Sequence, residues 1–135
     1  MKKDFDIPKV ENVAFAITHE LIENEPAYYV YLLNLRDDIM EGIMITCQGY
    51  GKDEQTGETI RTSLIRRSLE VLLPNEVAKI EPIMPEVFGL TNEYFISFWV
   101  EDTMYDKKFL FLPDSINEKN MVFIEQLGKK GVMIK

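Results

Sequence analysis

The sequence predicts an all-β domain in which two antiparallel sheets pack as a sandwich. Apolar and polar residues alternate in several segments, and alternation is typical of strands because successive side chains point to opposite faces. In the first strand we expect the row that contains Phe15 and Ile17 to be buried and the row that contains Ala14 and Ala16 to face water. Short stretches of polar, Gly or Pro residues separate these segments, and no amphipathic helix of ordinary length lies between them. The 135 residues are the size of one domain and contain no linker or repeat. We therefore expect a single domain over residues 1–135.

Polar and Pro-containing stretches set the ends of the predicted strands. Residues 23–26 end the first strand because Pro26 has no amide hydrogen for the ladder. The polar residues 36–38 make a short turn, so the second and third strands are expected to pair as a hairpin. Gly42 and Gly49 predict bulges in the third strand. The predicted strands cover residues 10–22, 27–35, 39–50, 60–67, 77–83, 94–101, 105–112 and 131–134.

The segment over residues 60–73 fits two structures. Its first residues alternate as in a strand, whereas the apolar residues from position 65 onward fit one face of a helix. We predict a strand through about Arg67, followed by a loop or short turn.

Residues 51–59 are rich in charge and glycine and predict an exposed loop. Residues 84–92 predict a crossing loop, residues 115–118 match a capping box, and the last strand is expected at a sheet edge.

One strand is expected at the centre of the core because both of its faces carry aromatic residues. Tyr94, Ile96 and Phe98 fall on one face, and Phe95 and Trp99 fall on the other. We expect Phe98, in the middle of this strand, to be deeply buried. Seven to nine short strands at this spacing, with at most a short helical turn, are typical of an immunoglobulin or fibronectin type III sandwich. A partly open barrel is the alternative.

The composition predicts a folded, acidic, cytoplasmic protein. Hydrophobic residues make up 46% of the chain and charged residues 28%, which excludes the disordered and fibrous classes. A formal net charge of −8 opposes binding to nucleic acid or to anionic membranes, so we expect neither as a partner. No apolar stretch is long enough for a membrane span or a signal peptide. The single cysteine permits no internal disulfide, which fits a reducing compartment.

The residue types that carry catalysis or bind metals are not grouped in this sequence. His19 lies in the apolar row of the first strand, where a hydrogen-bonded core or rim residue is expected. Cys47 lies in an apolar row and is expected to be buried and unreactive. One Cys and one His cannot form a zinc site, and the carboxylates of residues 53–58 lack calcium-loop spacing. We expect no catalytic, cofactor or metal residues, which favours a protein that is not an enzyme.

Two features are suited to contact with a partner. Three arginines between residues 61 and 67 form a basic cluster, interpreted either as solvated strand faces or as a contact for a polyanion. The Pro-flanked segment at residues 85–90 places apolar side chains in a loop, where they plug the end of the sandwich or anchor a partner. Aromatic strand residues are expected in the core, with a ligand cleft as the alternative. The candidate interaction residues are Arg61, Arg66, Arg67, Glu86, Val87 and Phe88.

Six stretches, spread over nearly the whole chain, carry a family resemblance: Ile7–Val13, Ala78–Glu81, Pro85–Phe88, Asn92–Tyr94, Asp106–Phe109 and Lys129–Val132. They resemble a family of short, uncharacterised bacterial proteins, some of whose members are labelled as a phenylalanine–tRNA ligase subunit. The resemblance implies a bacterial protein and supplies no catalytic residue. From the residues we predict a non-catalytic module that contacts a protein partner or forms a homodimer. The alternative is a tRNA-ligase-associated or small-molecule-binding auxiliary protein.

Overall fold

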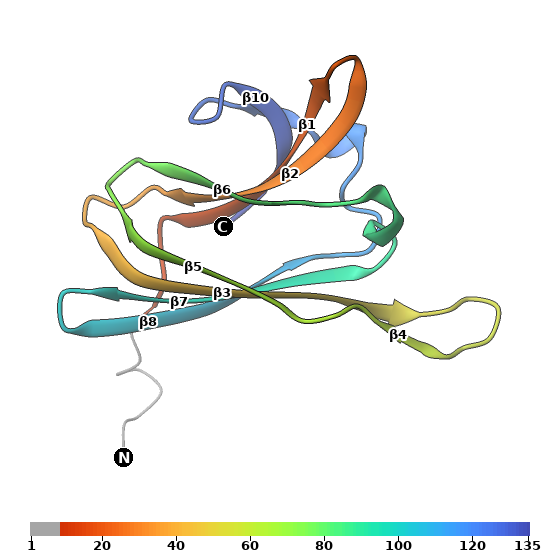
Figure 1. The fold of residues 1–135 in the computed structure, drawn as a ribbon, viewed down its shortest axis with the longest axis horizontal. Helices are drawn as coiled ribbons and strands as arrows, with labels where there is room; N and C mark the ends of the chain where they lie inside the picture. The colour runs from red at the N-terminus through yellow and green to blue at the C-terminus, as the bar shows by residue number, and fades with distance from the viewer. Residues whose placement is uncertain (1–8) are drawn as a thin grey trace.

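The structure, a computed structural model, describes residues 9–135 and consists of two antiparallel sheets stacked as layers (Figure 1). The predicted all-β sandwich is confirmed, with ten strands where seven to nine were predicted. Sheet A has the order β6-β2-β1-β10-β9 and contains β1 (Val13–Ile22), β2 (Glu25–Asn34), β6 (Val77–Pro82), β9 (Val122–Ile124) and β10 (Lys129–Ile134). Sheet B contains β3 (Met40–Lys52), β4 (Thr59–Arg61), β5 (Ile65–Leu72), β7 (Thr91–Val100) and β8 (Thr103–Phe111).

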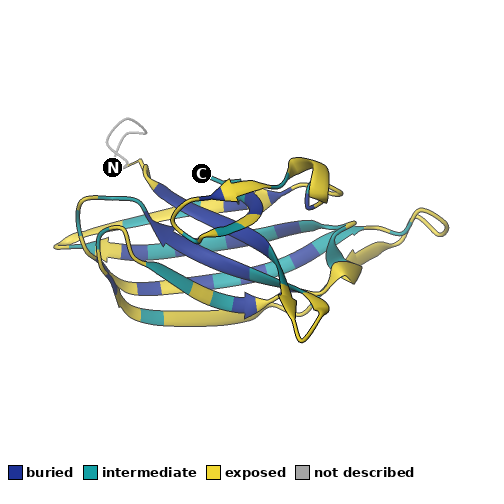
Figure 2. Ribbon diagram, turned by 90° about the horizontal axis from the view of Figure 1, so that it is seen from above, coloured by how far each residue is buried: buried dark blue, intermediate teal, exposed yellow. Residues whose placement is uncertain are grey.

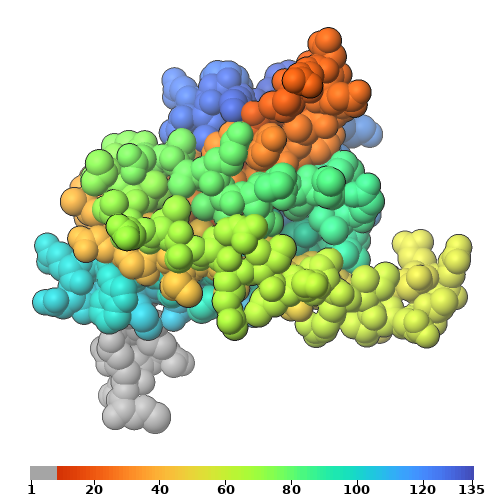
Figure 3. Space-filling model, in the orientation of Figure 1, coloured from red at the N-terminus to blue at the C-terminus, as the bar shows by residue number. Residues whose placement is uncertain are grey.

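The first eight strands follow the plan of a fibronectin type III sandwich. β1, β2 and β6 form one layer, and β5, β3, β7 and β8 form the other. β4 pairs with the far end of β3, and this hairpin arm projects from the body of the molecule (Figure 3). β9 and β10 are an addition to the plan, placed beside β1. Two short 3-10 helices, η2 (Pro85–Val87) and η3 (Glu118–Asn120), lie in the connections.

The main core lies between the two sheets. Buried residues are concentrated along the middle strands, whereas the connections and outer strands are exposed (Figure 2). Phe15 on β1 packs its ring against Tyr94, with ring centroids 5.2 Å apart, and against Phe109, with centroids 5.0 Å apart. Phe98 is fully buried, as predicted, whereas Trp99, on the other face of β7, is 44% exposed. Alternation therefore located the inner face of β7 correctly.

A second, smaller core covers the outer face of sheet A. Ala14, Ala16 and Leu33 are fully buried there, beneath Ile124 of β9. The prediction that alternate residues of the first strand face water is therefore wrong. Small alanine side chains leave space for β9 and β10, which curl over this face at the top of Figure 1. The last strand was predicted at a sheet edge, but β10 lies between β1 and β9.

β10 can approach β1 closely because one of its residues is glycine. A Cβ atom on Gly131 would lie 2.6 Å from the backbone oxygen of Ile17, closer than any side chain tolerates. Next to this contact, Lys129 Nζ donates to Glu20 Oε1 (3.0 Å) and to the Tyr31 hydroxyl (3.1 Å). Glu20 Oε2 also accepts from the hydroxyls of Tyr31 and Thr18. These polar contacts fix β10 to β1 and β2.

The segment over residues 60–73 forms strands and no helix. β5 continues to Leu72, beyond the predicted end at Arg67, because Met40–Cys47 of β3 supplies an antiparallel partner along its whole length. The predicted exposed loop at residues 51–59 is shorter, since β3 extends to Lys52 and β4 begins at Thr59. Tertiary pairing overrides the helical spacing of the leucines.

Three smaller predictions also differ from the structure or are refined by it. Gly42 has a φ of +54° at a register shift between β3 and β7, which confirms a bulge there. The pairing of β3 with β7 shows no such shift at Gly49. The capping box predicted at residues 115–118 does not form, because Asn117 caps η3 by accepting from the backbone amide of Asn120. The capped amide is therefore that of Asn120, two residues beyond the Glu118 amide that a cap at Ser115 would bond.

We expect Phe98→Ala to lower the free energy of unfolding by about 3–5 kcal/mol, because it removes a fully buried ring from the main core. Urea unfolding followed by circular dichroism measures this change as a lower midpoint. Phe123→Ala is the matched control, since Phe123 is 64% exposed, and its effect should stay within about 0.5 kcal/mol. An unchanged midpoint for Phe98→Ala would contradict the placement of the core.

The Glu20 contacts make stability depend on pH. Burial raises the pKa of Glu20, but hydrogen bonds from Lys129, Thr18 and Tyr31 outweigh it, so the pKa lies below the usual 4.5. The stabilisation is complete above the unfolded-state pKa and is lost as the pH falls through the lower folded-state pKa. We expect Glu20→Gln to lower the unfolding free energy at pH 7 by about 1–2 kcal/mol.

Urea titrations at neutral and acidic pH test this expectation. The unfolding free energy of Glu20→Gln should decline less on acidification than that of the wild type. Glu125→Gln, at an exposed position beside β9, should decline like the wild type. Parallel declines for the wild type and Glu20→Gln would exclude Glu20 as a source of the pH dependence.

Candidate functional site

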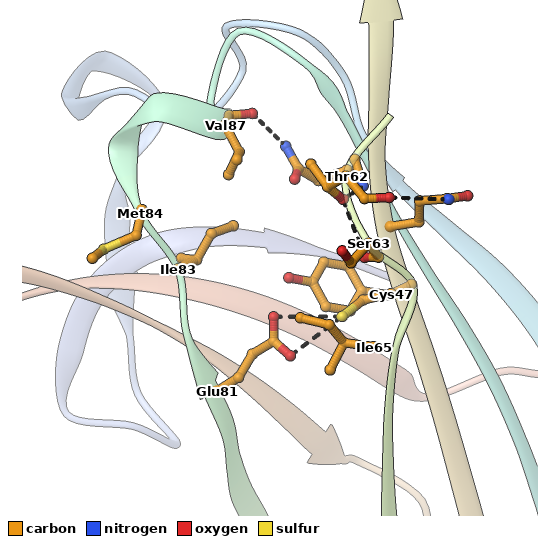
Figure 4. A pocket seen from close by; sticks show the side chains of 12 residues that line it. Cys47, Thr62, Ser63, Ile65, Glu81, Ile83, Met84 and Val87 are labelled. Carbon is orange, nitrogen blue, oxygen red and sulfur yellow. Dashed lines mark hydrogen bonds between the residues drawn. The ribbon is translucent and has the colours of Figure 1, made fainter. Parts of the chain in front are cut away.

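A pocket of about 200 Å³ opens between the two sheets on the side of β5 and β6. We call it the Glu81 pocket, after the residue at its base. Its walls come from β3, β6, β7, η2 and the link between β4 and β5. Figure 4 shows Thr62 and Ser63 on one side of the opening, and Ile83, Met84 and Val87 on the other. The lining is mostly apolar, which is typical of a site for a small ligand.

The pocket exists because the edge of sheet B is interrupted. β4 and β5 both pair with β3, but residues 62–64 between them leave the ladder. Thr62 holds this break in place, because its amide donates to Gly49 O (2.8 Å) and its Oγ1 accepts from Gly49 N (2.8 Å). A Cβ on Gly49 would lie 3.2 Å from the Thr62 side chain and 3.3 Å from Asn92 Oδ1. Glycine therefore permits the tight packing at this corner.

A second irregularity turns Glu81 into the pocket. In the pairing of β2 with β6, Tyr31 is opposite Lys79 and Val30 is opposite Glu81, so Ile80 is an extra residue. This bulge places Lys79 on the outer face, where its Nζ lies 3.8 Å from the Tyr29 ring centroid. Glu81 takes the inward direction of Val30 and is 9% exposed. Without the bulge, Lys79 and Glu81 would share a face.

The carboxyl group of Glu81 contacts the thiol of Cys47. Cys47 Sγ lies 3.2 Å from Glu81 Oε1 and 3.4 Å from Oε2, within hydrogen-bonding distance for a thiol donor. Figure 4 shows the carboxyl group pointing at this sulfur, with Ile65 beside it. Cys47 is buried and unpaired, as predicted, but its contact with a carboxyl group was not predicted. The site therefore joins residues from β3 and β6, on opposite sheets.

Burial and the charge of Glu81 raise the pKa values of the neighbouring thiol and phenol groups. Burial, followed by the negative charge of Glu81, raises the pKa of the Cys47 thiol to about 12. The same two causes, in the same order, raise the pKa of the Tyr94 hydroxyl. At neutral pH both groups are therefore neutral hydrogen-bond donors. A thiol in this state is a poor nucleophile.

The predicted interaction segment at residues 85–90 forms one rim of the pocket. Asn92 Nδ2 donates to the backbone oxygens of Val87 (2.9 Å) and Leu90 (3.2 Å), which holds η2 against the sandwich. Val87 lines the pocket, and Phe88 packs its ring edge against Tyr28 at 5.0 Å between centroids. Glu86 is exposed. Val87 and Phe88 pack against the main core, as the plug interpretation predicted.

The three predicted arginines do not share a single face. Arg66 is opposite Thr46 on β3, and Arg67 is opposite Ile45, so their side chains leave the strand in opposite directions. Arg61 lies on β4, with its guanidinium 5.7 Å from the ring centroid of Tyr50. Of these arginines, Arg67 is the one whose charge influences Cys47. Its positive charge lowers the pKa of the Cys47 thiol, but burial and the charge of Glu81 raise this pKa by more.

The other candidate residues lie outside the pocket. The His19 ring stacks on Tyr28 with centroids 5.0 Å apart, at the rim of the sheet. Asp53 Oδ1 accepts from the amides of Gln55 and Thr56, so it shapes the tip of the hairpin arm. Over residues 9–135, no three His, Cys, Asp or Glu side chains gather as a metal site requires. No helix in this part of the chain is long and apolar enough to cross a membrane.

Neither a known protein-family model nor a curated protein matches this chain. The resemblance to short bacterial proteins, and the link to a tRNA ligase that it implies, therefore stay predictions. The Glu81 pocket has to be interpreted from its own geometry.

We expect a thiol reagent to modify Cys47 slowly in the folded protein and at least about a hundredfold faster in urea, because burial shields the sulfur and a pKa of about 12 leaves little thiolate. The absorbance of the released chromophore gives both rates at neutral pH. Similar rates in the two states would show an accessible, reactive thiol.

Proposed function

We propose that this chain is a non-catalytic binding protein whose Glu81 pocket holds a small organic cation. The observation that carries the proposal is the buried carboxyl group of Glu81 inside a mostly apolar pocket. A primary ammonium group would donate to Glu81, and a short apolar chain attached to it would contact Ile83 and Val87. The volume of about 200 Å³ restricts the ligand to a small molecule.

The charge balance around Glu81 supports a cationic ligand. A buried carboxylate is unfavourable unless a cation or several hydrogen bonds compensate it. Among residues 9–135, no Lys, Arg or His side-chain nitrogen lies within 4.0 Å of the Glu81 carboxyl oxygens. A thiol is a weak donor, so Cys47 compensates the charge only in part. A bound ammonium group would supply the partner that the protein itself does not.

The neighbours of Glu81 are suited to holding a ligand and not to attacking it. Cys47 and Tyr94 have raised pKa values and remain protonated at neutral pH, so neither provides a nucleophile or a base. Both can orient the Glu81 carboxyl group as hydrogen-bond donors. The contacts with a protein partner predicted from the sequence are separate from this pocket and stay a prediction.

Two matched probes, n-butylammonium and n-butanol, test the proposal because they share an apolar chain and differ in charge. In an NMR chemical-shift titration of the wild type, we expect n-butylammonium to bind more tightly than n-butanol. Glu81→Gln should weaken its binding about tenfold to a hundredfold, since a charge-assisted hydrogen bond contributes about 1.5–3 kcal/mol. The affinity for n-butanol should stay unchanged.

Glu86→Gln is the matched control for this titration. Glu86 is an exposed carboxylate on η2, next to the rim of the pocket, and its removal should leave both affinities unchanged. The proposal would be refuted if n-butylammonium did not bind the wild type. It would also be refuted if n-butylammonium bound the wild type and Glu81→Gln with equal affinity. Shifts confined to residues outside the pocket would also refute it.

A further inference from the structure

One edge of sheet B is open. β8 pairs with β7 along its whole length, and over residues 9–135 no other strand pairs with it. Half of its backbone amide and carbonyl groups therefore point away from the sheet, which makes β8 a template for another strand. We propose that the occupant of this edge is β8 of a second copy of the chain, paired antiparallel about a two-fold axis midway between the two copies of Lys107, which we call the axis at Lys107.

The outward row of β8 carries a sequence that suits pairing with itself. Met104, Asp106, Lys108 and Leu110 alternate with inward residues and are all exposed. Their order along the strand is apolar, acidic, basic, apolar. A sequence of this kind is complementary to its own reverse, because reversal exchanges the acidic with the basic position and one apolar position with the other.

A two-fold axis perpendicular to the sheet keeps the outer face of each copy on the same side. With the axis at Lys107, residues equally far before and after it lie opposite each other. Asp106 then faces the partner's Lys108, and Met104 faces the partner's Leu110, and each pair occurs twice. Opposite charges and apolar side chains that face each other across strands both favour pairing.

The neighbouring registers are less favourable. An axis at Asp106 places the two Asp106 carboxylates opposite each other and sets Met104 against the partner's Lys108. An axis at Lys108 places the two Lys108 ammonium groups opposite each other and sets Asp106 against the partner's Leu110. Like charges directly opposite each other destabilise a strand pair. The register about Lys107 is therefore the one that the sequence of β8 specifies.

The two copies of Lys107 are opposite each other across the axis, on the inner face of their strands. In each copy, Lys107 Nζ lies 4.8 Å from the ring centroid of Phe109, two residues along the strand. The ring holds the charge away from the axis and so reduces the repulsion between the two copies of Lys107. On the same inner face, this register sets Tyr105 opposite the partner's Phe109, and both rings stay in the core of their own copy, where Phe109 packs on Phe15 and Tyr105 stacks on Phe98.

Charge exchange tests the surface and the register together. At about 100 µM, where a complex with micromolar Kd is mostly formed, native mass spectrometry should show the wild type at twice the 15.8 kDa of one chain. Asp106→Lys and Lys108→Asp should each weaken self-association about tenfold or more, because each places like charges opposite each other twice. A mixture of the two variants should restore the dimer as a heterodimer, since both charged pairs then join a lysine to an aspartate and the two apolar pairs are unchanged.

Lys52→Asp, an exposed charge change on the hairpin arm, is the matched control and should dimerise like the wild type. Circular dichroism verifies that each variant is folded. A wild type that stays monomeric, single variants that dimerise like the wild type, or a mixture that stays monomeric would each overturn the proposal.

A disulfide trap gives a second test that does not depend on the charge variants. Met104→Cys with Leu110→Cys, in a Cys47→Ser background, places cysteines opposite each other across the axis. Oxidation should yield a covalent dimer on a non-reducing gel, whereas Met104→Cys alone should not form one. Failure of the double variant to cross-link would overturn the proposed register.

Discussion

The burial of β1 and β2 on both faces is the constraint on which the rest of the structure depends. Their inward residues, including Phe15, pack against sheet B, and their outward residues, including Ala14 and Ala16, pack beneath β9 and β10. Gly131 allows the backbone of β10 to approach β1, and the contacts of Glu20 fix it there. β1 and β2 are thereby covered on both faces, by sheet B on one side and by the curled end of their own sheet on the other.

The two sides of the sandwich differ because their edges are built differently. On one side, β8 is a regular edge strand with an uninterrupted row of outward backbone groups. On the other, residues 62–64 break the edge of sheet B between β4 and β5, and the bulge at Ile80 interrupts β6 at the edge of sheet A. Irregular edges of this kind limit association between sheets and re-aim side chains, so a pocket forms where pairing fails.

Glu81 connects the fold to the proposed function. A carboxyl group at this depth destabilises a fold that gives it no cation, and an apolar residue of similar size would stabilise the sandwich more. Hydrogen bonds from Cys47 and Tyr94 offset this cost only in part, because neither donor carries a positive charge. A protein that keeps such a group at the base of an open pocket is better explained by a ligand than by stability, which is the basis of the proposed cation site.

The sequence by itself determined the strands, the sandwich and the central place of Phe98. Alternation is a local property of the sequence, and it shows directly which face of a strand is buried. It did not predict the second core, since alternation marked the row of Ala14 as exposed and only the packing of β9 and β10 covers it. It also did not predict the Glu81 pocket. Simple alternation places Lys79 and Glu81 on one face, and only the bulge at Ile80, which depends on pairing with β2, separates them. Tertiary structure decided these features because register and layer contacts join residues that are distant in the chain.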